Sequence, residues 1–249
     1  MAVGLGAART VPVAWMIPAF GGPLVPAPLR VGLGLTLSVL CLPLLVGQIP
    51  AAGPAMLVLL VLREAAVGVT LGFVGSLVFR SAEMAGRLTD ILRGANLAEV
   101  LSPVSQERTS PLGEVTLLLA VIIFLELGGP GHVATALARS YDAVPLARIV
   151  APAHPGQVAA LVLTASAQML ESALGLAAPA LVALLLADLA LGAVARAAPQ
   201  VPVYFVGMPL KALLGVGAVL LSVGALEQAL REGYRGWAGL LARAVAVWR

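Results

Sequence analysis

A long helical pattern between Met56 and Asn96 constrains the fold of this chain more than any other feature. The pattern begins as an apolar run and continues into a charged stretch. A helix of this length exceeds one bilayer crossing, because each residue adds about 1.5 Å and a hydrocarbon core is about 30 Å thick. It must therefore kink, leave the membrane or run inside a protein assembly, and the expected bends are at Gly72, Gly75 and Gly86.

Charges of alternating sign follow one face of the second half of this pattern. Steps of three or four residues place them on one stripe of a helix, each with an opposite charge one turn away: Arg80, Glu83, Arg87 and Asp90. The stripe is either a self-satisfied structural ladder or a polar surface that meets a channel or a partner subunit. If the ladder lies at low dielectric, Arg87→Leu should leave both acids unpaired and disrupt assembly.

Small residues precede the charged stripe at four-residue steps. Gly68, Gly72 and Ser76 form a small-xxx-small pattern, which lets another helix approach closely.

The composition indicates an integral membrane protein. Hydrophobic residues make up 60% of the chain and charged residues 11%, whereas a soluble domain has about 25% charged residues. We expect an all-α fold with one membrane domain over residues 1–249 and about five or six spanning helices of roughly 20 residues each. The net charge of +3 is small and dispersed, which argues against a nucleic-acid partner, and the single cysteine excludes an intrachain disulfide.

Proline and glycine positions divide the chain into further expected helices. Residues 156–198 should form two segments or one kinked hairpin, because Pro179 interrupts them. Residues 227–249 are amphipathic, as in an interfacial helix or a solvated C-terminal helix. A first short helix is expected to end near Phe20, and a second should cover 31–46 with a kink at Pro43. The remaining expected helices cover 114–127, 133–141 and 210–226.

Catalytic motifs are missing from the sequence. It has no G-x-S-x-G, P-loop or H-E-x-x-H pattern, and its two histidines lie in no cluster with metal-ligand spacing. We therefore expect neither an enzyme nor a cofactor or metal site.

Charges inside apolar runs are the remaining candidates for function. Glu64 follows Arg63, and Asp188 lies two turns from Arg196 on the same face, so each acid is either part of a structural ion pair or a proton-relay carboxylate. Lys211, the only lysine, completes the set of intramembrane or inter-subunit charges.

Several segments, taken in order, resemble one family. REAAVGVTLGFVGSLVFRSAEMAG, DILRGAN, LSP, TSPLG, FLELGGPGH and RAAPQVPVYFVGMPLK run from Arg63 to Lys211, with further agreement at Arg9 and Pro18. The chain is identified by these segments as similar to the SctT/FliR family of type III secretion export-apparatus subunits. DILRGAN and TSPLG are more similar to the injectisome branch than to the flagellar one.

The resemblance implies a core structural subunit of an export gate, through which unfolded secreted proteins cross the bacterial inner membrane. It implies bent helical hairpins in a hetero-oligomeric helical assembly with five R-type and four S-type subunits, the U switch protein and the V export-gate protein. It also implies that the multi-pass chain contacts membrane lipid, while the complex lies largely on the periplasmic side.

The resemblance also places a pore plug in one loop of this subunit. By position the plug comprises Ser102, Pro103, Val104, Ser105, Gln106, Glu107, Arg108, Thr109, Ser110 and Pro111. An independent secondary transporter or channel remains the alternative, because glycine- and proline-broken helices also occur in such proteins.

Overall fold

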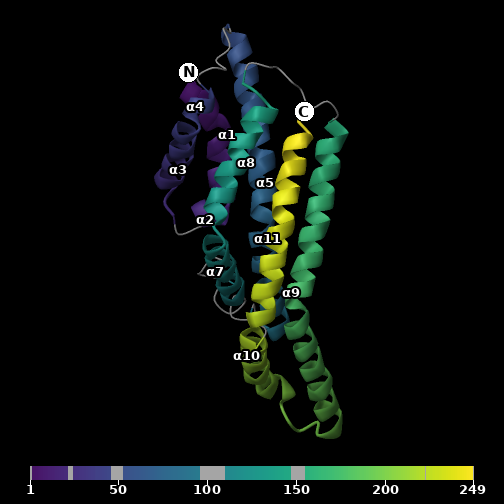
Figure 1. Cartoon of the computed structure of the whole chain (residues 1–249). Helices are drawn as coiled ribbons and strands as arrows, with labels where there is room; N and C mark the ends of the chain where they lie inside the picture. The colour runs from purple at the N-terminus through teal and green to yellow at the C-terminus, as the bar shows by residue number, and fades with distance from the viewer. Residues whose placement is uncertain are drawn as a thin grey trace. The chain divides into compact units, whose positions relative to one another are not determined.

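The computed structural model describes residues 2–21, 25–45, 53–95, 110–146, 155–221 and 223–248. Within these ranges every regular element is helical, which confirms the expected all-α class (Figure 1). The chain divides into two compact units, and each is described by itself. Unit 1 comprises residues 1–79, 121–168 and 233–249, and unit 2 comprises 80–120 and 169–232. A single membrane domain over 1–249 stays a prediction.

The helices differ greatly in length. In chain order they are α1 (Ala2–Met16), α2 (Pro18–Gly21), α3 (Ala27–Leu40), α4 (Leu42–Leu45), α5 (Pro54–Arg93), α7 (Pro111–Glu126), α8 (Gly129–Ala143), α9 (Pro155–Ala197), α10 (Val203–Leu221) and α11 (Val223–Ala246). Three of them, α5, α9 and α10, are long and apolar enough to cross a membrane, and a fourth crossing is reached if α7 and α8 form one broken span.

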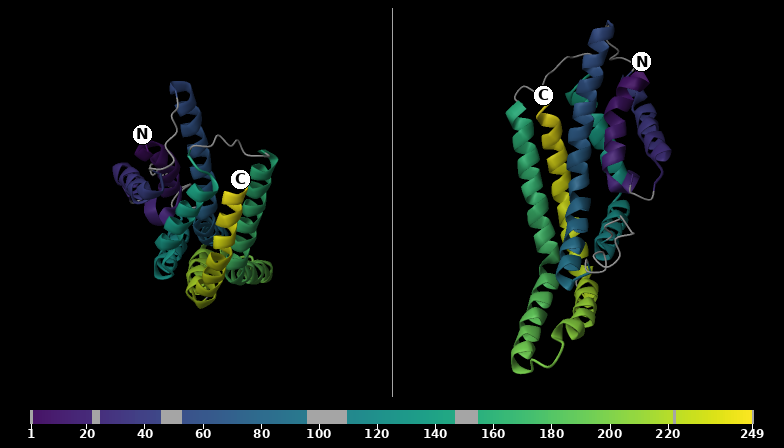
Figure 2. Two further views of the ribbon diagram at one scale, coloured as in Figure 1. Left: turned by 45° about the horizontal axis from the view of Figure 1, so that its top comes forward. Right: turned by 180° about the vertical axis from the view of Figure 1, so that it is seen from behind.

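In unit 1, α1 and α3 pack side by side, as the views from the front and from behind both show (Figures 1 and 2). Buried hydroxyls join the two helices. Thr10 Oγ1 donates to the Gly34 carbonyl at 2.7 Å, and Ser38 Oγ donates to the Val3 carbonyl at 3.0 Å. Because these donors are satisfied by backbone oxygens of the neighbouring helix, they fix the register of α1 against α3.

Helix α5 continues without a break through all three glycines at which bends were expected. In unit 1 its small residues instead admit α1. A Cβ at Gly68 would collide with the Arg9 backbone, and a Cβ at Gly72 would lie 3.1 Å from the Val13 Cα. Gly75 admits the Ile17 side chain in the same way. The close helix approach predicted from Gly68 and Gly72 is therefore confirmed, while the bends are not.

A sharp bend joins α7 and α8. Their axes differ by 72°, and Gly128 between them has a φ of +70°. Residues with a Cβ avoid this left-handed conformation, so glycine is the residue that allows the turn. Gly129 follows because a Cβ there would strike the Phe124 ring.

Helix α11 makes a protein contact that neither expectation for this tail included. In unit 1 its apolar stripe packs on α5 and α7, where Tyr234 and Trp237 lie against the Phe79 and Phe124 rings with centroids 5.7–6.0 Å apart. The Trp237 indole N–H donates to the Val74 carbonyl at 3.2 Å. Burial in this cluster raises the pKa of the Tyr234 phenol, which therefore stays protonated.

In unit 2, α9 and α10 form an antiparallel hairpin that packs on α7 through Leu112, Ala180 and Val219. Helix α9 is continuous through Pro179 rather than broken there. A proline removes one backbone donor, and helices in apolar surroundings tolerate that loss. Gly207 of α10 makes room for the Leu191 side chain of α9, which brings the two arms of the hairpin together.

Candidate functional site

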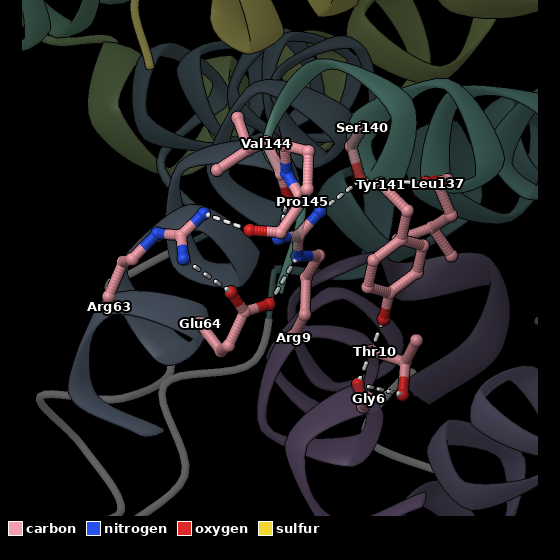
Figure 3. Close-up of polar contacts among 10 residues, drawn as sticks. All are labelled: Gly6, Arg9, Thr10, Arg63, Glu64, Leu137, Ser140, Tyr141, Val144 and Pro145. Carbon is pink, nitrogen blue, oxygen red and sulfur yellow. Dashed lines mark hydrogen bonds and ion pairs between the residues drawn. The ribbon is translucent and has the colours of Figure 1, made fainter. Parts of the chain in front are cut away.

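The Arg9 guanidinium joins three helices of unit 1 (Figure 3). Its Nε donates to Glu64 Oε2 at 2.7 Å, and its two terminal nitrogens donate to Ser140 Oγ and to the Val144 carbonyl, each at 2.9 Å. The Arg9 and Glu64 side chains are both fully buried. A buried ion pair is stable only if its other donors and acceptors are also bonded, and Arg9 meets this condition through α8.

Two further side chains complete this network (Figure 3). The Arg9 guanidinium lies 4.1 Å from the centre of the Tyr141 ring, whose hydroxyl donates to the Gly6 carbonyl at 3.1 Å. Arg63 donates to the Pro145 carbonyl at 2.9 Å and lies 3.7 Å from Glu64 Oε1. We name the set of Arg9, Glu64, Arg63, Ser140 and Tyr141 the arginine network.

The arginine network changes the pairing expected from sequence. Glu64 has its shortest contact with Arg9, fifty-five residues away, and only a longer one with its neighbour Arg63. The signal that identifies Arg9 was present, because it is the only charged residue before Arg30. A lone arginine in an apolar run requires an acid elsewhere.

The first part of the predicted charge ladder lies on the surface of unit 2. Glu83 accepts a hydrogen bond from Arg80 at 2.9 Å and another from Arg87 at 2.6 Å. Both arginine side chains are more than half exposed, whereas the Glu83 side chain is 13% exposed.

Asp90, the last predicted member of the ladder, pairs elsewhere. Its carboxylate accepts from Arg93 Nε at 2.6 Å, from Ser110 Oγ at 2.6 Å and from the Leu112 N–H at 3.0 Å. Arg87→Leu was expected to leave Asp90 unpaired. That expectation was wrong, because three other donors bond to the Asp90 carboxylate.

Asp90 thus caps the N-terminus of α7 from a different helix. A carboxylate at this position bonds a free backbone N–H and opposes the positive end of the helix dipole. Ser110 Oγ also accepts from the Gly113 N–H at 3.1 Å. Thr116 Oγ1 reaches the Ala82 carbonyl at 2.8 Å, so α5 and α7 meet closely.

This cap connects the predicted plug with the predicted charge ladder. Ser110 and Pro111 of the predicted plug are described, and Ser110 is bonded to Asp90 of the predicted ladder. The rest of the predicted plug, residues 102–109, lies outside the described residues.

Asp188 and Lys211 form an ion pair across the α9–α10 hairpin. Lys211 Nζ lies 2.8 Å from one carboxylate oxygen of Asp188 and 3.0 Å from the other. The structural ion pair expected as one alternative for Asp188 is formed with Lys211 on the antiparallel arm of α10, and not with Arg196 on its own helix. Arg196 is exposed in the last turn of α9.

A cleft of about 420 Å³ lies between α8 and α11 in unit 1. Exposed polar side chains of α8, among them His132, Arg139 and Asp142, form one wall, and Trp237 and Leu241 of α11 form the other. No group of three or more potential metal ligands occurs within the described parts of the chain.

Comparison with known proteins places this arrangement in context. Residues 1–235 match the family model of the bacterial export proteins, family 1. The chain is 33% identical to Yop proteins translocation protein T of Yersinia pestis over 171 residues, which are 69% of this chain and 64% of that protein.

Two other relatives represent secretion and flagellar systems. Secretion system apparatus protein SsaT of Salmonella typhimurium is 31% identical over 66% of this chain and 62% of its own length. Flagellar biosynthetic protein FliR of Bacillus subtilis is 28% identical over 83% of this chain and 79% of its own length. The chain thus spans a little under two thirds of the lengths of the translocation protein and of SsaT.

Proposed function

The chain belongs to the bacterial export proteins of family 1, and from this premise we propose that it is a core pore subunit of a type III protein-secretion export gate. The resemblance deduced from its motifs agrees with this family. In the proposed role the chain is part of the channel wall through which unfolded proteins cross the bacterial inner membrane. The observation that carries the proposal is the family match over residues 1–235, together with relatives named for translocation and secretion.

The exposed apolar surface of the chain supports a role inside an assembly. Within the most apolar windows of α9 and α10, only 22% and 11% of residues are buried by the chain itself. Large apolar side chains such as Phe205, Leu213 and Leu221 are each more than 70% exposed. Surface of this extent requires lipid or sister chains to cover it.

The proposed sister chains are the R-type and S-type subunits of the same export gate, with the U switch protein and the V export-gate protein as further partners. In this arrangement the chain closes a helical ring that lies largely on the periplasmic side of the inner membrane. Arginine-rich surfaces such as that around Glu83 would face polar groups of the assembly or the aqueous phase.

The proposed plug is the loop that precedes α7. Its support within the described residues is the tether at its C-terminal end, where Ser110 bonds to the buried Asp90 carboxylate. A loop with a fixed end can move without displacing the helix that follows it.

Co-isolation tests the proposed function. When the full chain is expressed with candidate R-type and S-type subunits, affinity purification should recover a defined hetero-oligomer containing all three. Expression without those subunits is the matched control. A stable chain that transports solutes alone or as a homo-oligomer would instead establish an independent transporter or channel.

Deletion tests the proposed plug. Residues 102–109 should be removed while Ser110 and Pro111 are kept, because Ser110 caps α7 and Pro111 is its first residue. We expect normal assembly and a raised leak of ions or small solutes through the closed complex. A glycine–serine segment of equal length controls for chain connectivity. An assembled deletion variant with an unchanged leak would contradict the plug assignment.

A further inference from the structure

Lys211 lies in the middle of an apolar span. Helix α10 has 19 residues, which correspond to about 28 Å and so match the thickness of one hydrocarbon core. Lys211 is the ninth of these residues and the only charged one. A lone ammonium at this depth is unstable in lipid unless it is paired.

Asp188 pairs with Lys211, but the Asp188 carboxylate itself stays partly exposed on the surface of the hairpin. The Asp188 side chain is 45% exposed, and that of Lys211 is 19% exposed. Lys211 Nζ lies within 3.0 Å of both carboxylate oxygens, so the pair is neutral as a whole. Each carboxylate oxygen nevertheless has lone pairs that one ammonium leaves available on the outer side.

The surroundings of this carboxylate are apolar. Leu185 and Leu189, three residues before and one residue after Asp188, are both more than half exposed. The hairpin end is polar by contrast, with Arg196 and Gln200 exposed. Asp188 lies nine residues from Ala197, the last residue of α9, which corresponds to about 13 Å along the helix. The half-exposed acid therefore lies well inside the apolar part of the hairpin, away from its polar end.

We propose that the Asp188 carboxylate is a docking point for an apolar helix of another subunit, which donates a hydrogen bond to it from a hydroxyl, amide or basic side chain. This inference rests on the proposed function, because a multi-subunit gate supplies such a helix. The partner must be protein rather than lipid, because lipid tails have no donor for a half-exposed carboxylate. The exposed leucines around Asp188 provide the apolar contact that accompanies the bond.

Photo-crosslinking at two neighbouring leucines tests which surface is covered. A photoreactive residue replaces Leu185, which is about 60° from Asp188 around α9, or Leu186, which is about 160° away. The two positions have similar exposure, 53% and 61%. In the co-expressed complex we expect more protein adduct at Leu185 than at Leu186. Lipid adducts alone at Leu185 would overturn the inference.

Substitution of the pair provides the second measurement. The double variant Asp188→Leu/Lys211→Leu removes both charges. If this surface faces lipid, the double variant should not lower the yield of complex, because leucine is more stable in lipid than an ion pair. If the surface faces a donor on a partner, the double variant should lower the yield of complex about tenfold, because one interhelical hydrogen bond is worth roughly that factor. Asp188→Asn should lower the yield less, because an amide oxygen still accepts.

The control pair is Glu227 and Arg231 of α11, which are 2.8 Å apart and comparably exposed but outside the candidate spans. Their double leucine variant should leave the yield of complex unchanged. An unaltered yield from the Asp188/Lys211 double variant would overturn this inference alone. Failure of the unsubstituted chain to co-isolate with any partner would instead overturn the proposed function.

Discussion

The arginine network of unit 1 and the Asp188–Lys211 pair of unit 2 place similar charges in different surroundings. In unit 1 the Arg9–Glu64 pair is fully buried, and Arg9 also donates to two oxygens at the C-terminal end of α8. In unit 2 the acid of the pair is nearly half exposed and adjoins exposed leucines. The chain itself encloses the first pair completely, whereas it leaves the acid of the second pair nearly half exposed.

This difference separates charges that hold the subunit together from charges available to other molecules. A buried guanidinium with satisfied donors has no capacity for a further ligand, so its loss should affect stability. A half-exposed carboxylate in an apolar surface retains acceptor capacity, so its loss should affect association.

The largest effect is expected from Arg9→Met. The substitution leaves the buried Glu64 without its closest partner, which should cost about 3–5 kcal/mol in the free energy of unfolding. Thermal unfolding of the purified chain measures the loss. The double variant Arg9→Met/Glu64→Met should recover much of the stability, because it leaves no unpaired acid. A single variant as stable as the unsubstituted chain would contradict the structural role of the network.

Cys41 provides a second measurement for the same variant. The thiol is buried near Tyr141 and Leu60, and burial raises its pKa, whereas the nearby Arg9 charge opposes that rise. If only the charge effect mattered, loss of Arg9 would raise the thiol pKa further and slow alkylation at neutral pH. We expect faster alkylation instead, because loss of the network loosens the packing around Cys41.

The next effect is expected at the contact of α1 with α5. Gly68→Val places side-chain atoms where the Arg9 backbone lies, and overpacking of this kind costs about 1–3 kcal/mol or more. The matched control is Gly175→Ala in α9, where a Cβ meets open space, and where alanine should stabilise the helix by up to about 1 kcal/mol. Equal melting temperatures for the two variants would contradict the proposed contact.

The same contact illustrates how much of the fold was predictable from sequence. The small-residue spacing around Gly68 and Gly72 correctly predicted a close helix neighbour, because a backbone can approach only where side chains are missing. The spacing did not identify α1 as that neighbour. Bends were expected at Gly72, Gly75 and Gly86 as well, and α5 continues through them without a break. Glycine permits both a bend and a contact, so tertiary packing decides between them.

The candidate site was predictable only for local pairs. Arg80, Glu83 and Arg87 pair as their spacing indicates, because helical geometry alone brings them together. The partners of Glu64, Asp90 and Asp188 come from other helices. Helical periodicity contains no information about which helices are neighbours, so these pairings required the tertiary structure. The amphipathic pattern of α11 left an interfacial and a solvated helix open, and it did not indicate that protein covers its apolar stripe.

A smaller effect is expected from Ser110→Ala. The substitution removes one of the three hydrogen bonds to Asp90 and the bond that Ser110 accepts from Gly113. Loss of a capping side chain costs about 1 kcal/mol. In the Ser110→Ala variant, limited proteolysis within residues 102–109 should become faster. The control is Ser140→Ala, which changes a serine of the arginine network that is remote in sequence. Cleavage rates raised equally by both variants would indicate general destabilisation rather than release of this tether.

The smallest effect is expected from Arg87→Leu, although the charge stripe alone suggested a large one. The Arg87 side chain is 56% exposed, and pairs between exposed charges contribute at most about 1 kcal/mol. Glu83 keeps its bond to Arg80, and Asp90 keeps its three other donors. Thermal unfolding should therefore change little, whereas Asp90→Leu should destabilise unit 2 clearly because it leaves the α7 N-terminus uncapped. If Arg87→Leu proves as damaging as Asp90→Leu, the exposed face of this stripe must be covered in the assembled protein.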